Sequence, residues 1–334
     1  MTRRRRRLNY DHLRYLIQHS LDDCPEFGGR VEVAGKINRI AEGIWHDNYW
    51  FRVQGRNLPA ARSDQAFILR LLERRYDWQQ GPEPRERLVR EAESLRVLAQ
   101  LDFSHPTPEF TCFVRDDESE IIGMIETALP GVSLDGRKER AAVRLIGRAA
   151  AAVHRMPIER FAHLPTSDDR AHHVKARIAE LDDALFAEFP LAREVRGWIE
   201  AHLPSGDRRS LLHGDLLPQN LLCDCWEPVR EDAVVGVIDW EMASIGDPAY
   251  DLAIVSRGNR KILGVQRGLE ILVEAYLESG GKPISVTDVH VHELLLVLHW
   301  LAESWREHQE PGAGGHAPDF YETKLRSLFR RAAS

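Results

Sequence analysis

The sequence changes character once, at Leu129-Pro130-Gly131. Before this point, short runs rich in β-branched and aromatic residues alternate with turn residues and predict strands at 36–41, 49–53, 65–72, 109–115 and 120–126. After it, apolar residues recur mainly at helical spacing. Strands gathered in one half and helices in the other are typical of α+β proteins. The sequence therefore predicts a small N-terminal lobe built on an antiparallel sheet and a larger, mainly helical C-terminal lobe.

Three segments follow from this division. Residues 1–30 form a basic arm and an N-terminal helix over 9–21, residues 31–128 form the first lobe, and residues 129–334 form the second. The first lobe carries one helix, over about 85–100. In the second lobe the apolar spacing predicts helices at 141–155, 174–189, 193–202, 263–279 and 288–308, the last with Thr287 as its N-cap.

Composition excludes several classes of protein. Lys and Arg number 45 against 52 Asp and Glu, a net charge of −7, which disfavours general nucleic-acid binding because that requires a concentrated basic face. No window approaches the ~18 uninterrupted apolar residues of a membrane span. Four cysteines in 334 residues are too few for a disulfide framework. We therefore expect a cytoplasmic protein without nucleic-acid or membrane partners.

Two segments of the second lobe carry residues suited to chemistry. The run LLHGDLLPQNLLC, residues 211–223, places Asp215 and Asn220 five positions apart on a loop between short apolar strands. The run VVGVIDW, residues 234–240, delivers Asp239 at the end of an apolar strand. Taken alone, Asp239 is equally suited to forming a turn. Polar residues at the ends of buried strands are nevertheless typical of binding and catalytic sites.

The chemistry of these residues favours phosphoryl transfer. Mg²⁺ takes oxygen ligands from one or two carboxylates together with substrate phosphates, and Asn220 and Asp239 can supply such ligands. Asp215 is then left to accept a proton from a hydroxyl nucleophile. The spacing Asp-x-x-x-x-Asn, with a second aspartate after the next hairpin, is that of a kinase catalytic loop and its metal-binding aspartate.

These motifs resemble those of the aminoglycoside phosphotransferase and choline kinase superfamily. Its His-Gly-Asp-x-x-x-x-Asn loop corresponds to His213 through Asn220, and its Ile-Asp-Trp motif to Ile238 through Trp240. Its Gly-Asp-Pro-x-x-Asp-Leu-Ala motif corresponds to Gly246 through Ala253. The resemblance covers about residues 30 to 305. It implies a two-lobed, protein-kinase-like fold and a kinase that transfers the γ-phosphoryl group of ATP or GTP to a hydroxyl of a small molecule, with Mg²⁺ as cofactor.

The resemblance extends to the first lobe and implies that this lobe binds the nucleotide. Arg70 occupies the position where protein kinases carry a phosphate-binding lysine, and Glu91 resembles its ion-pair partner. Lys36 is the only lysine before Lys138, so arginine must take this role. The glycine-rich loop of protein kinases is missing, and Gly43 is the single glycine where that loop is expected. Nucleotide binding is therefore assigned to Arg70, Glu91 and Gly43, and metal binding to Asn220 and Asp239.

Alternatives to these assignments remain open at the level of sequence. His213 and Asp215 are also a possible metal-binding pair of a hydrolase, although structural roles suit His213, Asp247 and Asp251 better. The chain can also be a non-catalytic nucleotide-binding module. The acceptor is unidentified, with aminoglycosides, choline, sugars, macrolides and other amino-alcohols as candidates. Six acidic residues suit ammonium groups of an aminoglycoside, or form an ordinary solvated face: Glu270, Glu274, Glu278, Glu303, Glu307 and Glu310.

Overall fold

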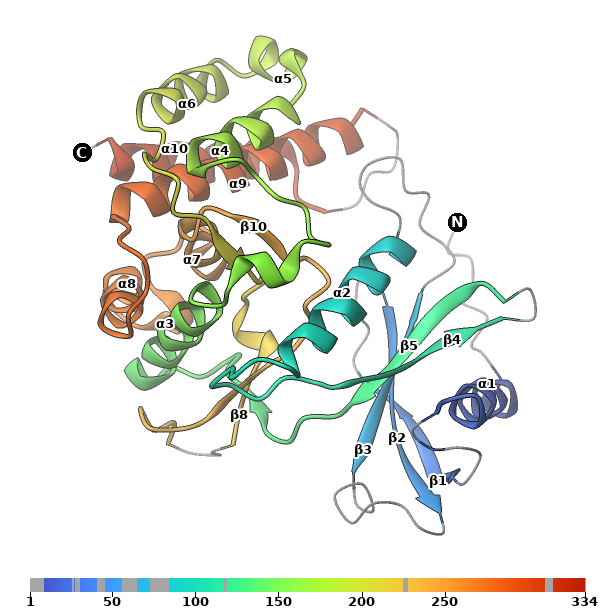
Figure 1. Ribbon diagram of the computed structural model, residues 1–334. Helices are drawn as coiled ribbons and strands as arrows, with labels where there is room; N and C mark the ends of the chain where they lie inside the picture. The colour runs from blue at the N-terminus through green and yellow to red at the C-terminus, as the bar shows by residue number, and fades with distance from the viewer. Residues whose placement is uncertain are drawn as a thin grey trace. The chain divides into compact units, whose positions relative to one another are not determined.

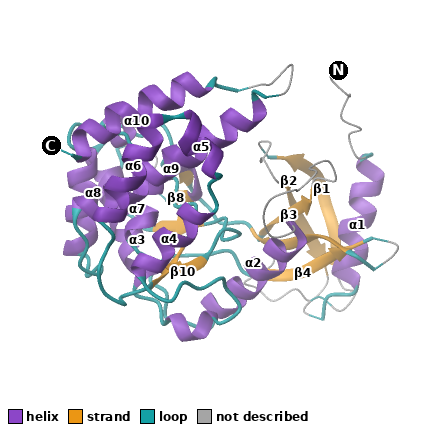
Figure 2. Cartoon of the chain, turned by 90° about the horizontal axis from the view of Figure 1, so that it is seen from above, coloured by secondary structure: helices purple, strands orange, loops and turns teal. Residues whose placement is uncertain are grey.

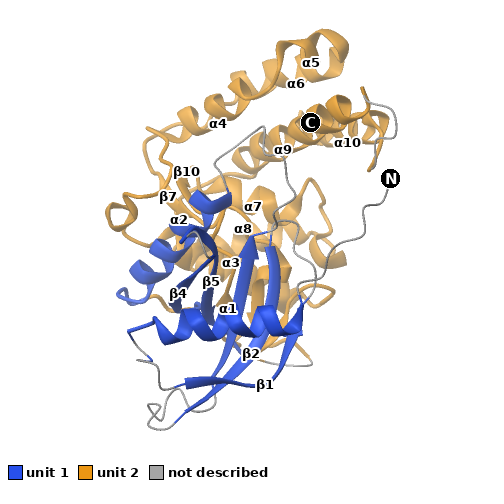
Figure 3. Cartoon of the chain, turned by 90° about the vertical axis from the view of Figure 1, so that its right-hand side faces the viewer, with its two compact units in different colours: residues 1–102, 106–130 blue, residues 103–105, 131–334 orange. Residues whose placement is uncertain are grey.

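The structure is a computed structural model of the chain, and it describes residues 9–25, 27, 31–40, 46–55, 65–72, 84–116, 119–224, 228–309 and 315–333. The chain divides into two compact units. Unit 1 comprises residues 1–102 and 106–130, and unit 2 comprises residues 103–105 and 131–334 (Figure 3). The mixed composition, with an antiparallel sheet early in the chain and helices later, confirms the predicted fold class.

Unit 1 is built around a five-stranded antiparallel sheet in the order β1-β2-β3-β5-β4. Its elements are α1 (Tyr10–Asp22), β1 (Val31–Arg39), β2 (His46–Gly55), β3 (Ala66–Leu72), α2 (Pro84–Leu98), β4 (Phe110–Arg115) and β5 (Ile121–Thr127). The sequence predicts all five strands, although β1 and β2 extend further than expected. The unit carries two helices where one was predicted, because α1 belongs to it.

The two faces of this sheet are covered differently. On β3, Phe67, Leu69 and Leu71 alternate onto the face that packs against α1, where they share a buried apolar cluster with Leu16 and Ile17. Arg70 points to the opposite face, toward α2, where it meets Glu91. Figure 2 shows α1 and α2 on opposite sides of the strands. The pleat of β3 therefore separates the apolar core of unit 1 from its charged pair.

Unit 2 is mainly helical (Figure 1). Its longer helices are α3 (Arg140–His154), α4 (Arg170–Ala179), α5 (Asp183–Glu188), α6 (Pro190–Ala201), α7 (Ala249–Ser256), α8 (Gly268–Glu278), α9 (Val286–Glu307) and α10 (Pro318–Ala332). Short 3-10 helices lie at Ile158–Phe161, Pro218–Asn220 and Ile262–Gly264. Its strands are β6 (Val132–Ser133), β7 (Ser210–Leu212), β8 (Leu221–Cys223), β9 (Val235–Val237) and β10 (Ser244–Gly246).

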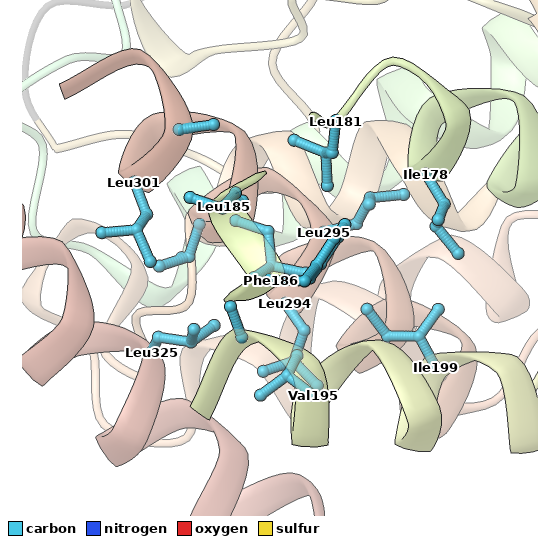
Figure 4. Close-up of a cluster of buried hydrophobic side chains, with 14 of the residues drawn as sticks. Ile178, Leu181, Leu185, Phe186, Val195, Ile199, Leu294, Leu295, Leu301 and Leu325 are labelled. Carbon is cyan, nitrogen blue, oxygen red and sulfur yellow. The ribbon is translucent and has the colours of Figure 1, made fainter. Parts of the chain in front are cut away.

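The helical core of unit 2 explains where sequence periodicity misleads. The single helix predicted over 174–189 is wrong: α4 ends at Ala179, and Asp182 caps a new helix, α5, by accepting a hydrogen bond from the amide of Ala184 at 2.8 Å. Leu181, Leu185 and Phe186 stay on the apolar cluster shared with α9 and α10 (Figure 4). The chain therefore changes direction while its apolar spacing still resembles one helix.

Other helix ends also differ from prediction. Ser285, not Thr287, is the N-cap of α9, where it forms a capping box with Asp288. The helix predicted from residue 263 begins only at Gly268, because Leu263 and Arg267 adopt left-handed backbone conformations. Helix α10 was not predicted at all, although Leu325 and Leu328 are buried against α9. No helix in the described ranges combines the length and apolar character needed to cross a membrane.

Candidate active site

The β8–β9 hairpin brings Asn220 and Asp239 to the same end of two antiparallel strands. Asn220 directly precedes β8, and Asp239 follows β9 by two residues. Leu221 pairs with Val237, and the amide of Ile238 donates a hydrogen bond to the carbonyl oxygen of Asn220 at 3.0 Å. Because the strands run in opposite directions, the start of one lies beside the end of the other. Two residues nineteen positions apart are thus held next to one another by backbone pairing.

Asp215 and Asn220 are joined directly. The Asn220 Nδ2 donates to the backbone oxygen of Asp215 at 2.8 Å and to its carboxylate Oδ2 at 3.0 Å. Both partners only accept hydrogen bonds, so the amide nitrogen must face Asp215 and the amide oxygen must face away. Asn220 is buried and Asp215 is half-buried. The five-residue spacing therefore closes a small loop whose two functional side chains orient one another.

His213 fastens this loop to the strand that carries Asp239. Its Nε2 lies 2.9 Å from the carbonyl oxygen of Ile238, and its Nδ1 accepts a hydrogen bond from the amide of Asp215 at 3.3 Å. The first contact requires a proton on Nε2 and the second a lone pair on Nδ1, so neither ring nitrogen remains for a metal. This geometry opposes the hydrolase alternative and agrees with the structural role predicted for His213. Trp240 is buried with its ring 4.8 Å from that of His213.

Asp251 anchors the loop that carries Asp215. Its Oδ2 accepts a hydrogen bond from the amide of His213 at 2.8 Å, and its Oδ1 accepts one from the amide of Gly214 at 2.9 Å. Gly214 has a φ of +81°, and a Cβ there would overlap the carbonyl oxygen of Met242. The prediction that Asp251 ties down the catalytic loop is confirmed by these bonds. The glycine of His-Gly-Asp is needed for both backbone angle and space.

A buried chain of polar groups extends from Asp251 toward α8. His154 Nε2 lies 3.0 Å from Asp251 Oδ2, and His154 Nδ1 lies 3.1 Å from the hydroxyl of Tyr276. That hydroxyl accepts a hydrogen bond from the amide of Lys282 at 3.0 Å, so its own proton points to His154. Burial would raise the pKa of Asp251, but the bonds from His154 and the loop amides lower it below its ordinary value. The carboxylate is therefore kept ionised in the core.

Asp247, the other acidic residue of this motif, is also structural. It is fully buried, and it accepts hydrogen bonds from Arg170 Nε at 2.8 Å and from the amide of Ala249 at 3.1 Å. His292 Nε2 lies 3.0 Å from its second oxygen. Burial opposes ionisation, but these partners more than offset it and lower the pKa of Asp247 to about 2. Asp247 thus lies just before α7, accepts a hydrogen bond from the first residue of that helix and connects it to α4 and α9.

Asp215 has a raised pKa. Burial is the main cause, and the nearby carboxylate of Asp239 adds to it. His213, the hydrogen bond from Asn220 and the charge of Arg257 act in the opposite direction. A carboxylate with a raised pKa is a stronger base once ionised, and this is the property that proton abstraction from a hydroxyl requires.

The donor atoms around Asp239 suit a hard cation. Asn220 commits its amide nitrogen to Asp215, so its Oδ1 is turned away, and in the described chain that oxygen accepts no hydrogen bond. Asp239 has a φ of +70°, an unusual conformation for a residue with a side chain and one often found at functional sites. Carboxylate and amide oxygens are the ligands that Mg²⁺ accepts. The residues present fit the metal that the sequence predicts.

In unit 1, Arg70 and Glu91 form the expected ion pair. Arg70 Nη1 lies 2.7 Å from Glu91 Oε1, and Arg70 Nη2 lies 3.3 Å from His46 Nδ1. All three side chains are buried. Gly43, the third residue predicted to bind nucleotide, lies outside the described residues. A buried guanidinium with a fixed carboxylate partner is a rigid cation, as phosphate recognition requires.

Half of the six acidic residues considered as an aminoglycoside-binding face form ion pairs. Three of them lie on α8 and pair with arginines: Glu270 with Arg260 at 3.1 Å, Glu274 with Arg140 at 3.6 Å and Glu278 with Arg144 at 2.6 Å. Glu303 and Glu307 are exposed on α9, and Glu310 lies outside the described residues. These pairs favour the ordinary solvated face over a site for ammonium groups.

A unit with a five-stranded antiparallel sheet, a mainly helical unit, and a loop that holds Asp215 and Asn220 beside Asp239 are the features of a protein-kinase-like fold. Comparison with known proteins agrees. The model of the phosphotransferase enzyme family, APH, matches residues 36–311, and the chain therefore belongs to that family. The predicted resemblance to aminoglycoside phosphotransferases is confirmed.

Solved structures share this fold along nearly the whole chain. The macrolide 2'-phosphotransferase MphH from Brachybacterium faecium superposes with a TM-score of 0.62 at 22% identity, covering 95% of this chain and 98% of that one. The GDP and kanamycin complex of APH(2")-IIia gives a TM-score of 0.63 at 15% identity, covering 96% and 98%. At these identities the similarity shows the fold alone.

Curated relatives of this chain are named as acyl-CoA dehydrogenases. A probable acyl-CoA dehydrogenase, IBR3 of Arabidopsis thaliana, is 26% identical in an alignment of 248 residues that covers 65% of this chain and 28% of the relative. Acyl-CoA dehydrogenase family member 11 of Pongo abelii is 26% identical in an alignment of 183 residues that covers 49% of this chain and 22% of the relative. The chain spans less than a third of the length of either relative.

Sequence reasoning missed the residues that support the site from other helices. His154 and Tyr276 lie 97 and 25 residues from Asp251 along the chain, and no motif links them. One signal was available: His154 ends an alanine-rich apolar helix, where a buried histidine needs a partner. Arg257, whose charge acts on Asp215, was also overlooked.

Proposed function

We propose that this protein transfers the γ-phosphoryl group of a purine nucleoside triphosphate to a hydroxyl group of a small molecule. The observation that carries the proposal is the oriented pair of Asp215 and Asn220, with Asp239 at the end of the adjoining strand. Membership of the phosphotransferase enzyme family supports it, as does the fold shared with nucleotide-bound phosphotransferases.

Each residue of this group has a defined task. Asn220 holds the Oδ2 of Asp215, which leaves Oδ1 to accept the proton of the acceptor hydroxyl. As that oxygen attacks, its bond to the γ-phosphorus forms, the bond from phosphorus to the β-phosphate oxygen breaks, and the nucleoside diphosphate leaves. Asp239 and Asn220 Oδ1 would hold Mg²⁺, which would supply positive charge to the phosphates.

Arg70 is assigned to the nucleotide phosphates. Glu91 fixes one edge of its guanidinium, so its position is set before nucleotide arrives. A planar guanidinium binds two phosphate oxygens at once, which a lysine ammonium cannot do with the same geometry. Both ATP and GTP are tested as the phosphoryl donor.

Two acceptor classes are supported by different similarities. Structural neighbours are named for macrolides and aminoglycosides, which makes an antibiotic one candidate. The curated relatives are named as acyl-CoA dehydrogenases and are much longer than this chain. A phosphotransferase that shares sequence with proteins of acyl-CoA chemistry can act on a hydroxylated acyl thioester, and this is the second candidate.

The decisive experiment measures nucleoside diphosphate release with ATP or GTP over a panel of hydroxyl compounds from both classes. Asp215→Ala is expected to lower kcat by about 10² to 10⁴ while nucleotide still binds in calorimetry. Asp232→Asn, a change on the exposed surface of the same unit, is the matched control and should keep full activity. Equal turnover by Asp215→Ala would overturn the mechanism, and nucleotide binding without any product would favour a non-catalytic module.

A further inference from the structure

The turn after α7 presents an unusual cation beside the proposed catalytic base. Arg257 ends α7 with a φ of +48°, a left-handed conformation that is unfavourable for a residue with a side chain. Six residues separate it from Asp251, so it lies about 9 Å further along the helix from the anchored loop. Its charge acts on Asp215. Its guanidinium is exposed, and within the described chain it makes no hydrogen bond or ion pair.

This turn is held firmly by the two C-terminal helices. Arg331 of α10 donates a hydrogen bond to the carbonyl oxygen of Gly258 at 2.9 Å, and Leu328 lies beneath Gly258. Ser256 donates to Glu293 of α9. Arg257 is thus held in a left-handed conformation at the C-terminal end of α7, where a residue in this conformation commonly ends a helix.

A second cation stands next to this turn. Lys324 of α10 has its Nζ 4.8 Å from the ring centre of the half-buried Trp300 of α9, a cation–π contact. Its side chain also borders Gly258. The pKa of Lys324 is lowered, chiefly by burial and also by the charge of Arg257, whereas the charge of Glu293 acts in the opposite direction. Lys324 makes no ion pair among the residues that the structure describes.

The carboxylate whose charge acts on Lys324, Glu293, is already engaged by other partners. Glu293 is buried, and its two oxygens are taken by Ser256 and by His290, whose Nδ1 lies 2.5 Å away. Arg260 in turn occupies the other nitrogen of His290 at 2.8 Å. Arg257 and Lys324 thus lie where α7, α9 and α10 meet, and neither forms an ion pair among the described residues.

We propose that Arg257 and Lys324, with Trp300 beneath, bind an anionic group of the phosphoryl acceptor, so that the molecule phosphorylated carries a carboxylate or a phosphate. The inference rests on the proposed function. A polycationic acceptor would be repelled from Asp215 by these charges, whereas an anion bound there would place a neighbouring hydroxyl within the field of the base.

The test compares three acceptors of matched shape: 3-hydroxybutyrate, its neutral amide and the cationic 4-aminobutan-2-ol. Kanamycin and 3-hydroxybutyryl-CoA extend the comparison to a large cation and a large anion. We expect kcat/KM to be about tenfold or more higher for each anion than for its neutral or cationic counterpart. Phosphorylation of the cations in preference, or of no anion in the set, would overturn the inference. Phosphorylation of any of these acceptors would still support the proposed phosphotransferase function.

Variants separate recognition from a general effect on the base. Arg257→Gln and Lys324→Gln should reduce the ratio of kcat/KM for acid over amide by about tenfold, mainly through KM, because both acceptors use the same Asp215. Arg326→Gln, on the exposed side of α10, is the control and should keep the ratio. Since glycine is favoured in this left-handed conformation, Arg257→Gly should abolish the preference for the acid over the amide without lowering Tm. An unchanged ratio in folded Arg257 variants would refute the assignment.

Discussion

Replacement of Asp251 by asparagine tests how the catalytic loop is held. The carboxylate accepts three hydrogen bonds in the core, from the amides of His213 and Gly214 and from His154. Asparagine has the same shape but only one accepting oxygen, so its amide nitrogen must face at least one of these donors. The least damaging orientation turns the nitrogen toward Gly214 and keeps the other two bonds to a neutral oxygen.

The expected loss follows from that orientation. One buried N–H without a partner costs about 1–3 kcal/mol, and two bonds that change from a charged to a neutral acceptor lose about 1 kcal/mol each. The free energy of unfolding should therefore fall by about 3–5 kcal/mol, and Tm by on the order of 10 °C. Since Gly214 adjoins Asp215, kcat should fall as well, while nucleotide binding changes less.

Urea and thermal unfolding of Asp251→Asn beside wild type measure this effect, with the exposed Asp232→Asn as control. The pKa of Asp251 is lowered from 3.8, so its contribution is complete above that pH and disappears as the pH falls through the lowered value. The stability difference between wild type and variant should accordingly narrow in acid. A variant as stable as wild type at pH 7 would refute the anchoring role, and so would a difference that widened at low pH.

Three further predictions concern the site itself. Arg70→Lys should raise the KM for nucleotide about tenfold or more, because one ammonium cannot both bind Glu91 and contact two phosphate oxygens. Steady-state kinetics with varied ATP or GTP measures this, and an unchanged KM would contradict the role of Arg70. Asp239→Asn should weaken Mg²⁺-dependent nucleotide binding in calorimetry, whereas affinity measured in EDTA should change little, and unchanged affinity with Mg²⁺ would remove the metal assignment. Because the pKa of Asp215 is raised, kcat should begin to fall on the acidic side of its pH profile at a pH above 3.8. Asn220→Ala should move this fall to higher pH, because it removes a hydrogen bond to the ionised carboxylate. A shift to lower pH would be inconsistent with Asp215 as the base.

Local spacing explains why so much of the site could be predicted. Asp215 and Asn220 lie five residues apart, and the hairpin that delivers Asp239 is formed by the next two strands in the chain. Gly214 is fixed by the backbone of the same loop. Such contacts join neighbours in sequence, so residue type and spacing carry the information. The strands of unit 1 were predicted for the same reason, since alternation along each strand reports which face is buried.

The ends of the helices were harder to predict from the sequence. The apolar spacing over 174–189 persists through the break after α4, because Leu181 and Leu185 pack on the same cluster from two different helices. Periodicity reports burial and does not report that the backbone changes direction. The cap at Asp182 is visible in the sequence, but only the structure shows that it begins a new helix.

The sequence by itself determined the fold class, the loop that joins Asp215 to Asn220 and the identity of the cation, Arg70, available to the first lobe. Only the tertiary structure decided what holds and surrounds that loop. His154 reaches Asp251 across 97 residues, and Lys324 reaches the turn at Arg257 and Gly258 from a helix that the sequence did not reveal. Such partners are chosen by the packing of whole helices, which depends on every apolar face at once, and no local pattern of residues records it.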